Sequence, residues 1–273
     1  MDLNHVILES GDILIDPPGR DDRVLFDLEF HPRDTIRMNK VLIHMNGSSV
    51  ELSGLYDLHK RYFSEMQFYT RGFSMEDLGL YFKKKGIQAK GHVKGEIGLF
   101  SPSGKPADTD VLGRIEGKGL RLPELFSPGI RGYELDLDLS GKVVTINHCK
   151  MQLGENLLDV SGKLRGWEAL RGDILVQSDF FDMSDIFAPQ SGSMGKEEGN
   201  GFVANLLNRG QIGVRVEINN GAWRHVKYGP LEAELSFRDG DIYIERSRAD
   251  LENGFLTLNG RVMGGDNHEL LFS

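Results

Sequence analysis

The side chains of this chain that could do acid–base or metal chemistry are scattered rather than clustered. None of the eight histidines pairs with another at the spacing of metal ligands on one element. His148 and Cys149 are adjacent, so on an extended strand they would point to opposite faces. Asp136 and Asp138 would share a face and could bind a cation weakly, but acids that alternate along a strand usually face water. We therefore expect no catalytic residues, no metal site and no cofactor.

Short functional motifs are missing as well. The sequence contains no G-x-S-x-G nucleophile elbow, no phosphate-binding loop, and no G-x-G-x-x-G between a strand and a helix. The formal net charge is −9, whereas a basic face supplies most of the affinity of nucleic-acid binders. The sequence thus favours a protein that is not an enzyme and does not bind nucleic acid.

Apolar side chains are what the chain offers in quantity, and they recur with a period of two. Phe26, Leu28 and Phe30 alternate with Asp27 and Glu29, and two later segments alternate in the same way. Such alternation is typical of an antiparallel strand with one wet face and one apolar face. The residues that we expect to line the apolar face are Phe26, Leu28, Phe30, Val50, Leu52, Met66, Phe68, Leu135, Leu137, Leu139, Leu158, Val160, Leu164, Ile174, Val176, Val214, Val216, Leu235, Phe237, Leu256, Leu258 and Val262.

These strands belong to an internal repeat. Residues 38–82 recur without a gap at 146–190, and a third, partial copy begins near Tyr243. In each copy a glycine ends a strand that follows a turn rich in asparagine and glycine, which supply the positive φ of a tight hairpin. Self-similarity at a period of roughly 100 residues indicates a repeat protein. The glycines that fix the register are Gly54, Gly162 and Gly260.

Each copy predicts five strands followed by a short helical turn. Ser74 and Asp182 are candidate N-caps, and helix is expected near 75–84, 183–187 and 202–208. The predicted strands are 11–16, 24–30, the hairpin 38–54 and 66–70 in the first copy; 117–122, 133–139, the hairpin 146–162 and 174–178 in the second; and 211–219, 231–237, the hairpin 244–260 and 270–273 in the third.

This pattern predicts a mainly all-β fold: an elongated, curved antiparallel sheet of repeated five-strand units that forms a groove, with short connecting helices and more than about 45% strand. We expect a first repeat at 1–86, a second at 87–189 that includes a leading hairpin, a flexible loop at 190–201, and a third repeat at 202–273. One short helix per unit cannot cover five strands. The sheet must therefore either close into a sandwich or curl into a groove that meets an apolar ligand, and alternation fits both.

The chain stops inside the predicted strand 270–273, which would leave an apolar edge unpaired. We expect it to be part of a longer protein whose export and membrane signals lie outside these residues. Exposed terminal strands of this kind could also associate edge to edge with another copy.

Segment 210–264 resembles the C-terminal region of AsmA-like proteins of Gram-negative envelopes. The recurring pattern is an alternating strand, a glycine turn before Ile-x-Ile, and a hairpin that ends in Leu-x-Leu-x-Gly-x-Val. It stands at 239–244 and 256–262, recurs at 141–146 and 158–164, and is matched more loosely by residues 1–60.

The resemblance implies a repeating β-groove in which stacked units form a trough for lipid acyl chains. It further implies carriage of phospholipid between the inner and outer membranes by a periplasmic protein whose full-length form is anchored in the inner membrane. Membrane attachment would then come from parts of the full-length protein outside this chain. A different class remains open: a closed β-solenoid or sandwich that acts as a structural or assembly scaffold for outer-membrane biogenesis and carries no ligand.

Overall fold

A computed structural model describes most of the chain, and nearly all of the described residues lie in β-strands. The predictions of an all-β fold and of more than about 45% strand are confirmed. Side chains are described from Thr35 onward, apart from some loop and strand-end residues. The described residues are 6–14, 23–31, 35–45, 48–76, 90–105, 108–121, 130–153, 155–166, 169–185, 210–262 and 270–272.

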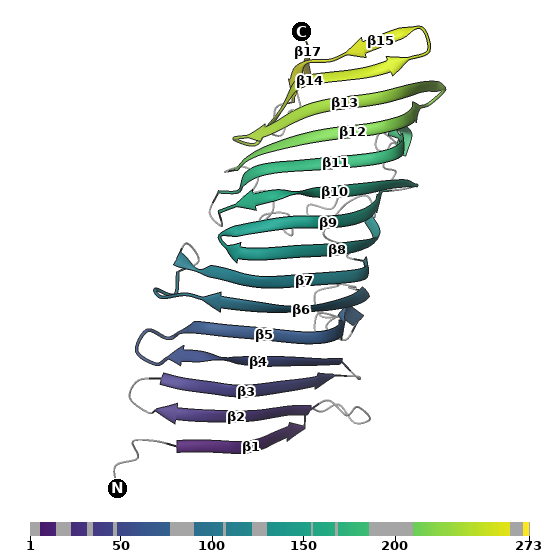
Figure 1. Ribbon diagram of the computed structural model, residues 1–273. Helices are drawn as coiled ribbons and strands as arrows, with labels where there is room; N and C mark the ends of the chain where they lie inside the picture. The colour runs from purple at the N-terminus through teal and green to yellow at the C-terminus, as the bar shows by residue number, and fades with distance from the viewer. Residues whose placement is uncertain are drawn as a thin grey trace, which may run out of the picture. The chain divides into compact units, whose positions relative to one another are not determined.

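The chain divides into two compact units. Unit 1 comprises Met1–Arg121 and Leu135–Val143, and unit 2 comprises Leu122–Glu134 and Val144–Ser273. In unit 1, successive strands pair antiparallel from β1–β2 through to β6–β7 (Figure 1). Its strands are β1 (Val6–Leu14), β2 (Arg23–His31), β3 (Thr35–Met45), β4 (Ser48–Asp57), β5 (Tyr62–Ser74), β6 (Lys90–Phe100), β7 (Asp110–Arg121) and most of β8 (Ile130–Gly141).

Among the described strands of unit 2, pairing is antiparallel with one exception. β11 and β12 run parallel, whereas the pairs from β12 to β17 and the pair β10–β11 are antiparallel. The strands are β9 (Val143–Leu153), β10 (Asn156–Arg165), β11 (Arg171–Asp182), β12 (Gln211–Trp223), β13 (Val226–Arg238), β14 (Asp241–Leu251), β15 (Gly254–Thr257), β16 (Gly260–Val262) and β17 (Leu270–Phe272).

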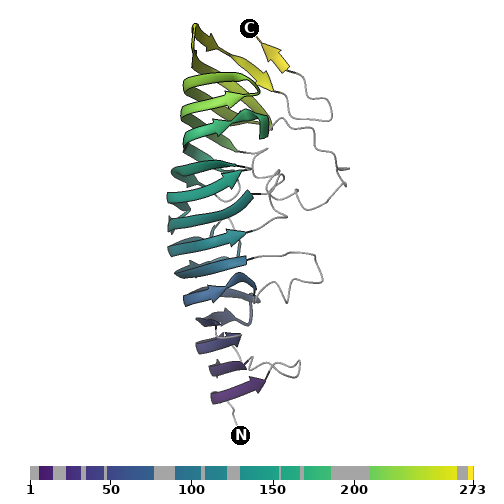
Figure 2. The same ribbon diagram turned by 90° about the vertical axis from the view of Figure 1, so that its right-hand side faces the viewer.

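Within each unit the described strands form one open, curved layer (Figure 2). A sandwich would require a second sheet facing the first, and the described residues contain none. The open sheet follows from the local sequence, because strands with one polar and one apolar face are joined mostly by short turns. No helix in the described part of the chain is long and apolar enough to span a membrane.

The sequence repeat is also a structural repeat. The hairpin β4–β5 and the hairpin β10–β11 have the same register, shifted by one copy, so equivalent residues face equivalent partners. The prediction that Gly54 and Gly162 occupy equivalent strand positions is confirmed. The matched pairs are Leu52–Phe68 with Val160–Val176, and Gly54–Met66 with Gly162–Ile174.

Equivalent side chains also tie the strand ends together in both copies. The Ser48 hydroxyl accepts a hydrogen bond of 3.0 Å from the Ser74 amide, and the Asn156 side-chain oxygen accepts one of 2.6 Å from the Asp182 amide. The two acceptors are buried, at 6% and 1% exposed. Ser48 and Asn156 therefore make equivalent hydrogen bonds although their side chains differ in length, so the equivalence is not evident from the residue types.

The predicted N-caps lie where the strands end. Ser74 hydrogen-bonds the Glu76 carboxylate at 2.6 Å, and the Asp182 carboxylate accepts a bond of 2.8 Å from the Ser184 amide. Helix begins at residue 75 in the first copy, and the 3₁₀ helix η3 (Met183–Asp185) follows β11 in the second. The predicted helix at 202–208 and the predicted loop at 190–201 lie outside the described residues.

Element boundaries differ from the predictions in two respects. Most strands are longer than predicted, and β5 extends well beyond 66–70, because its polar residues occupy the wet face instead of ending the strand. The fourth strand of the third copy, expected to be continuous, is split between β15 and β16. The break falls where Ser247 exchanges hydrogen bonds with the backbone of Leu258, at 2.8 and 3.1 Å. The predicted leading hairpin is present as β6–β7, with Gly104 at φ +71° in its turn, and it belongs to unit 1.

Candidate functional site: the apolar face of the sheet

One face of the sheet in unit 1 carries apolar side chains that adjoin across neighbouring strands. Leu52 of β4 lies opposite Phe68 of β5, and Phe68 lies opposite Ile97 of β6. Burial alternates along β5: Met66 and Phe68 are half-buried, and Gln67 between them is exposed. Because side chains point alternately to the two faces of a sheet, this register places apolar residues of successive strands in rows on one face.

The other predicted residues near the start of unit 1 follow the same register. Val50 lies opposite Ile43 of β3, and both side chains are half-buried. For three residues of β2 only the backbone is described, so their register is known and their side-chain contacts are not. Phe26, Leu28 and Phe30 have Val41, Met38 and Ile36 as their Cα partners on β3.

β8 presents leucines on one face and acids on the other. Leu135 lies beside Gly117 of β7, where a Cβ added to the glycine would be 3.5 Å from that of Leu135. On the opposite face Arg114 donates hydrogen bonds of 3.1 and 2.7 Å to Asp136, and these bonds raise the pKa of Arg114. The carboxylate therefore faces a cation of the protein itself. The half-buried leucines that share one face by alternation are Leu135, Leu137 and Leu139.

Unit 2 continues the same construction through its parallel pair. Ile174 of β11 lies opposite Val214 of β12, which lies opposite Leu235 of β13, and Val176 lies opposite Val216 in the next row. All five side chains are half-buried. The first row continues to Ile244 of β14, past a register shift beside Leu235, whereas the second row runs through Ala233 to Ser247.

The remaining predicted residues of unit 2 lie on this face with different degrees of burial. Val160 is nearly covered at 9% exposed, whereas Leu256 on β15 is 55% exposed. Val262 is placed by its backbone alone, opposite Ile242 and Leu270. The half-buried members are Leu158, Leu164, Phe237 and Leu258.

Close packing is concentrated at one end of the strands of unit 2. Phe181, Ile218 and Tyr228 form a buried cluster, and the Tyr228 hydroxyl donates a hydrogen bond of 2.7 Å to the carbonyl oxygen of Phe181. Burial, together with the nearby negative charge of Asp182, raises the pKa of Tyr228 to about 12. This cluster anchors the sheet, and most of the predicted apolar face lies outside it.

The leading hairpin also contributes to the apolar face, which the sequence analysis did not predict. Ile97 and Leu99 of β6 lie opposite Phe68 and Met66, and Val111 of β7 lies opposite Leu99. Glycines at several positions of this hairpin break the visible alternation, so the segment looked like a connector. The signal that could have revealed this contribution is the spacing of Ile97 and Leu99, which are two residues apart and therefore share a face.

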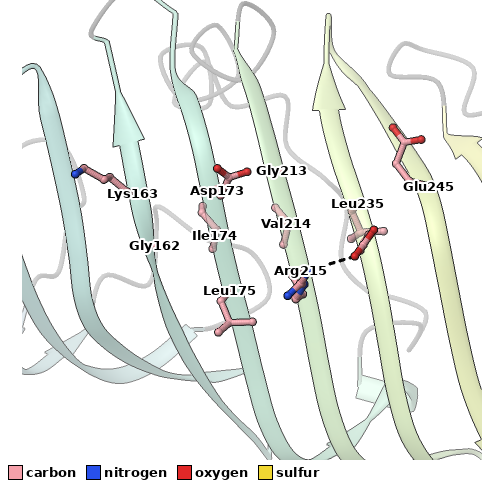
Figure 3. A pocket seen from close by; sticks show the side chains of 11 residues that line it. Gly162, Lys163, Asp173, Ile174, Leu175, Gly213, Val214, Arg215, Leu235 and Glu245 are labelled. Atoms are coloured by element: carbon pink, nitrogen blue, oxygen red, sulfur yellow. Dashed lines mark hydrogen bonds and ion pairs between the residues drawn. The ribbon is translucent and has the colours of Figure 1, made fainter.

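The opposite face carries charged side chains, together with exposed apolar ones such as Phe100 and Leu112 in unit 1. A hollow of about 680 Å³ in unit 2 is bordered by charged side chains of neighbouring strands (Figure 3). Arg215 and Glu234 form an ion pair of 3.3 Å across it. The hollow therefore has a mixed lining, because Ile174, Val214 and Leu235 of the apolar row border it as well. Its lining residues are Gly162, Lys163, Asp173, Ile174, Leu175, Gly213, Val214, Arg215, Glu234, Leu235 and Glu245.

Titratable side chains elsewhere form no reactive centre in the part of the chain that the structure describes. The His148 imidazole lies 3.1 Å from the Asp159 carboxylate, the counterpart of the Lys40–Glu51 ion pair of 3.3 Å in the first copy. Cys149 is buried on the other side of its strand, and burial raises the pKa of its thiol. No group of three or more metal-ligating side chains occurs among the described residues.

An open apolar sheet face, built from repeated units, is the class of site that this fold defines. No protein-family model matches the chain, and no curated protein matches its sequence significantly.

Proposed function

We propose that this chain is part of a lipid-transfer protein of the cell envelope whose apolar sheet face carries phospholipid acyl chains. One observation carries the proposal: apolar side chains adjoin from strand to strand in both units, and most of them remain half-buried. A soluble protein rarely leaves so many adjoining apolar side chains incompletely packed unless something binds there.

The proposed mechanism is passive solvation of acyl chains. Each methylene group that moves from water onto the apolar face contributes about 0.8 kcal/mol. The rows that include Phe68 and Val214 consist of hydrocarbon side chains and glycines in most strands, so a bound chain meets similar surroundings as it moves along them. Charged residues are on the other face, as Arg215 and Glu234 show. The lipid headgroup would therefore remain in water at the strand ends.

The proposed location is the space between the inner and outer membranes of a Gram-negative envelope, with the full-length protein anchored in the inner membrane. Support for this location comes from the resemblance of 210–264 to AsmA-like proteins. The scaffold alternative predicts the same repeat but no bound lipid, so occupancy of the face separates the two.

The test uses two neighbouring aromatic positions on β5 that point to opposite faces. Phe68 is half-buried on the apolar face, and Tyr69 is 41% exposed on the polar face. A photo-reactive benzoylphenylalanine replaces each residue in turn, in cells whose phospholipids carry radioactive phosphate. We expect a labelled lipid adduct at Phe68 and none at Tyr69.

A second matched pair, Val214 and Arg215 on β12, repeats the comparison in unit 2. Both reporters in a pair are adjacent on one strand, so expression and local stability affect them similarly. Equal labelling on both faces, or no labelling at Phe68 and Val214, would refute the transfer proposal and leave the scaffold.

A further inference from the structure

The hairpin that joins β12 and β13 reaches beyond the strands on either side of it. Its last pair is Trp223 with Val226. On one side β11 ends at Asp182, opposite Ala222, and on the other side β14 ends at Leu251, opposite Tyr228 (Figure 1). Residues 223–227, here called the hairpin tip, therefore project from the end of the sheet in unit 2.

The hairpin tip is exposed and has two different sides. All five of its residues are exposed, with Trp223 at 49% and Val226 at 54%. Two residues inward on each strand lie Gly221 and Tyr228, both buried, and Tyr228 belongs to the apolar cluster. By strand alternation Trp223 and Val226 extend that apolar side, and Lys227 lies on the other.

The charge of this segment is opposite to that of the chain. The whole sequence has 41 acidic and 32 basic residues, yet residues 218–231 contain no acid. The same stretch contains Arg224, His225 and Lys227, all at the tip. Aromatic and apolar side chains beside basic ones are the combination that favours the interface of an anionic membrane.

The tip is held in place from its base. Arg224 adopts a left-handed φ of +57°, and its amide donates a hydrogen bond of 3.0 Å to the Ser184 hydroxyl of η3. Tyr228, just inward, is tied to the Phe181 carbonyl. A preformed tip loses little conformational entropy on binding, so its few side chains can contribute to affinity.

We infer that the hairpin tip inserts Trp223 and Val226 into the interface of a bilayer containing anionic phospholipid, with Arg224 and Lys227 among the headgroups. The inference rests on the proposed function, because it names the lipid surface that the apolar face meets. Membrane contact at the tip brings the bilayer to the end of the strands where the apolar side reaches solvent.

The test uses the full chain and vesicles of stated composition. The sequence has two tryptophans, so Trp167→Phe leaves Trp223 as a single reporter. With vesicles of phosphatidylcholine and phosphatidylglycerol we expect a blue shift of Trp223 emission and quenching by lipids brominated near the headgroup. Binding should be at least tenfold weaker with pure phosphatidylcholine and should weaken as salt is raised.

Matched variants separate the tip from general electrostatics. Arg224→Glu combined with Lys227→Glu should weaken binding at least tenfold with an unchanged melting temperature. Lys163→Glu combined with Arg171→Glu reverses two exposed charges elsewhere in unit 2 and should change binding less than twofold. Trp223→Ser, read by vesicle sedimentation, should also weaken binding.

The inference would be overturned by no binding to anionic vesicles, by binding with unshifted Trp223 emission, or by equal losses in the two charge-reversed variants. Capture of the tip by a protein partner in place of vesicles would overturn it as well. The photo-crosslinking at Phe68 distinguishes the failures. Lipid adducts at Phe68 without vesicle binding would refute only membrane insertion by the hairpin tip. Vesicle binding without adducts would refute only the carriage of acyl chains on the apolar face.

Discussion

At the scale of single residues, Tyr228 links packing to pH. Its pKa is raised to about 12 from an ordinary value of 10, chiefly by burial. The unfolded chain therefore ionises this phenol first, and stability that is fully present below pH 10 falls as the pH rises toward 12. A buried carboxylate paired with a cation behaves in the opposite way, because the stability that it contributes is lost as the pH falls.

We predict that Tyr228→Phe removes this part of the alkaline loss. The variant should be about 1 kcal/mol less stable than the parent at pH 8, because the hydrogen bond to Phe181 is lost. The difference should shrink between pH 10 and pH 11.5 in urea unfolding measurements. Tyr69→Phe, at an exposed position, is the control and should leave the pH dependence unchanged. A constant difference across this range would contradict the assignment.

At the scale of elements, Gly54 and Gly162, which mark the first two copies of the repeat, are required by close approach of the next strand. A Cβ on Gly54 would lie 2.5 Å from the Glu65 carbonyl oxygen, and one on Gly162 would lie 2.3 Å from that of Asp173. Neither backbone oxygen can move away without breaking its strand pairing.

We predict that Gly54→Ala and Gly162→Ala each lower the free energy of unfolding by at least about 2 kcal/mol. Gly72→Ala is the matched control, since no atom lies within 4 Å of its added Cβ, and it should change stability by no more than about 0.5 kcal/mol. Chemical denaturation measures all three. A loss in one copy only would argue against equivalent roles.

Alternation made the strands and their two faces predictable, because it follows directly from the geometry of an extended chain. The alternation places Leu135 and Asp136 on opposite faces of the sheet, and likewise Met66 and Gln67. Alternation carries no information on direction, so the parallel pairing of β11 with β12 could not be predicted. The contribution of Ile97 was hidden because neighbouring glycines leave gaps in the apolar pattern. The shared work of Ser48 and Asn156 depends on three-dimensional contact between strand ends and has no signature in residue type.

At the scale of the whole molecule, both units carry rows of half-buried apolar side chains that the proposed ligand would cover. We predict that the purified protein carries lipid and that extracting the lipid lowers its melting temperature. A ligand at one hundred times its Kd stabilises the folded state by about 2.7 kcal/mol, so adding lipid back should restore the transition. Scanning calorimetry with native mass spectrometry measures both effects.

The matched control for this prediction places a charge on either face of one strand. Val214→Asp should reduce lipid retention and abolish the lipid-dependent shift in melting temperature, because an ionised carboxylate is costly to bury beneath an acyl chain. Arg215→Asp, on the polar face, should retain both. An unchanged melting temperature after complete extraction of the parent protein would contradict carriage of lipid on this face.

The one parallel pairing has a further consequence, for growth by duplication. Five antiparallel strands are an odd number, so a plain meander would begin each new copy in the reverse direction. Within unit 2 the parallel step from β11 to β12 keeps the direction. Within unit 1 the extra strand β6 has the same effect. It pairs antiparallel with both β5 and β7, so β5 and β7 run in the same direction. In both arrangements the next copy begins in the same strand direction as the one before it. Whole copies can therefore be gained or lost without reversing the strands that follow, whereas gaining or losing a single strand would reverse them.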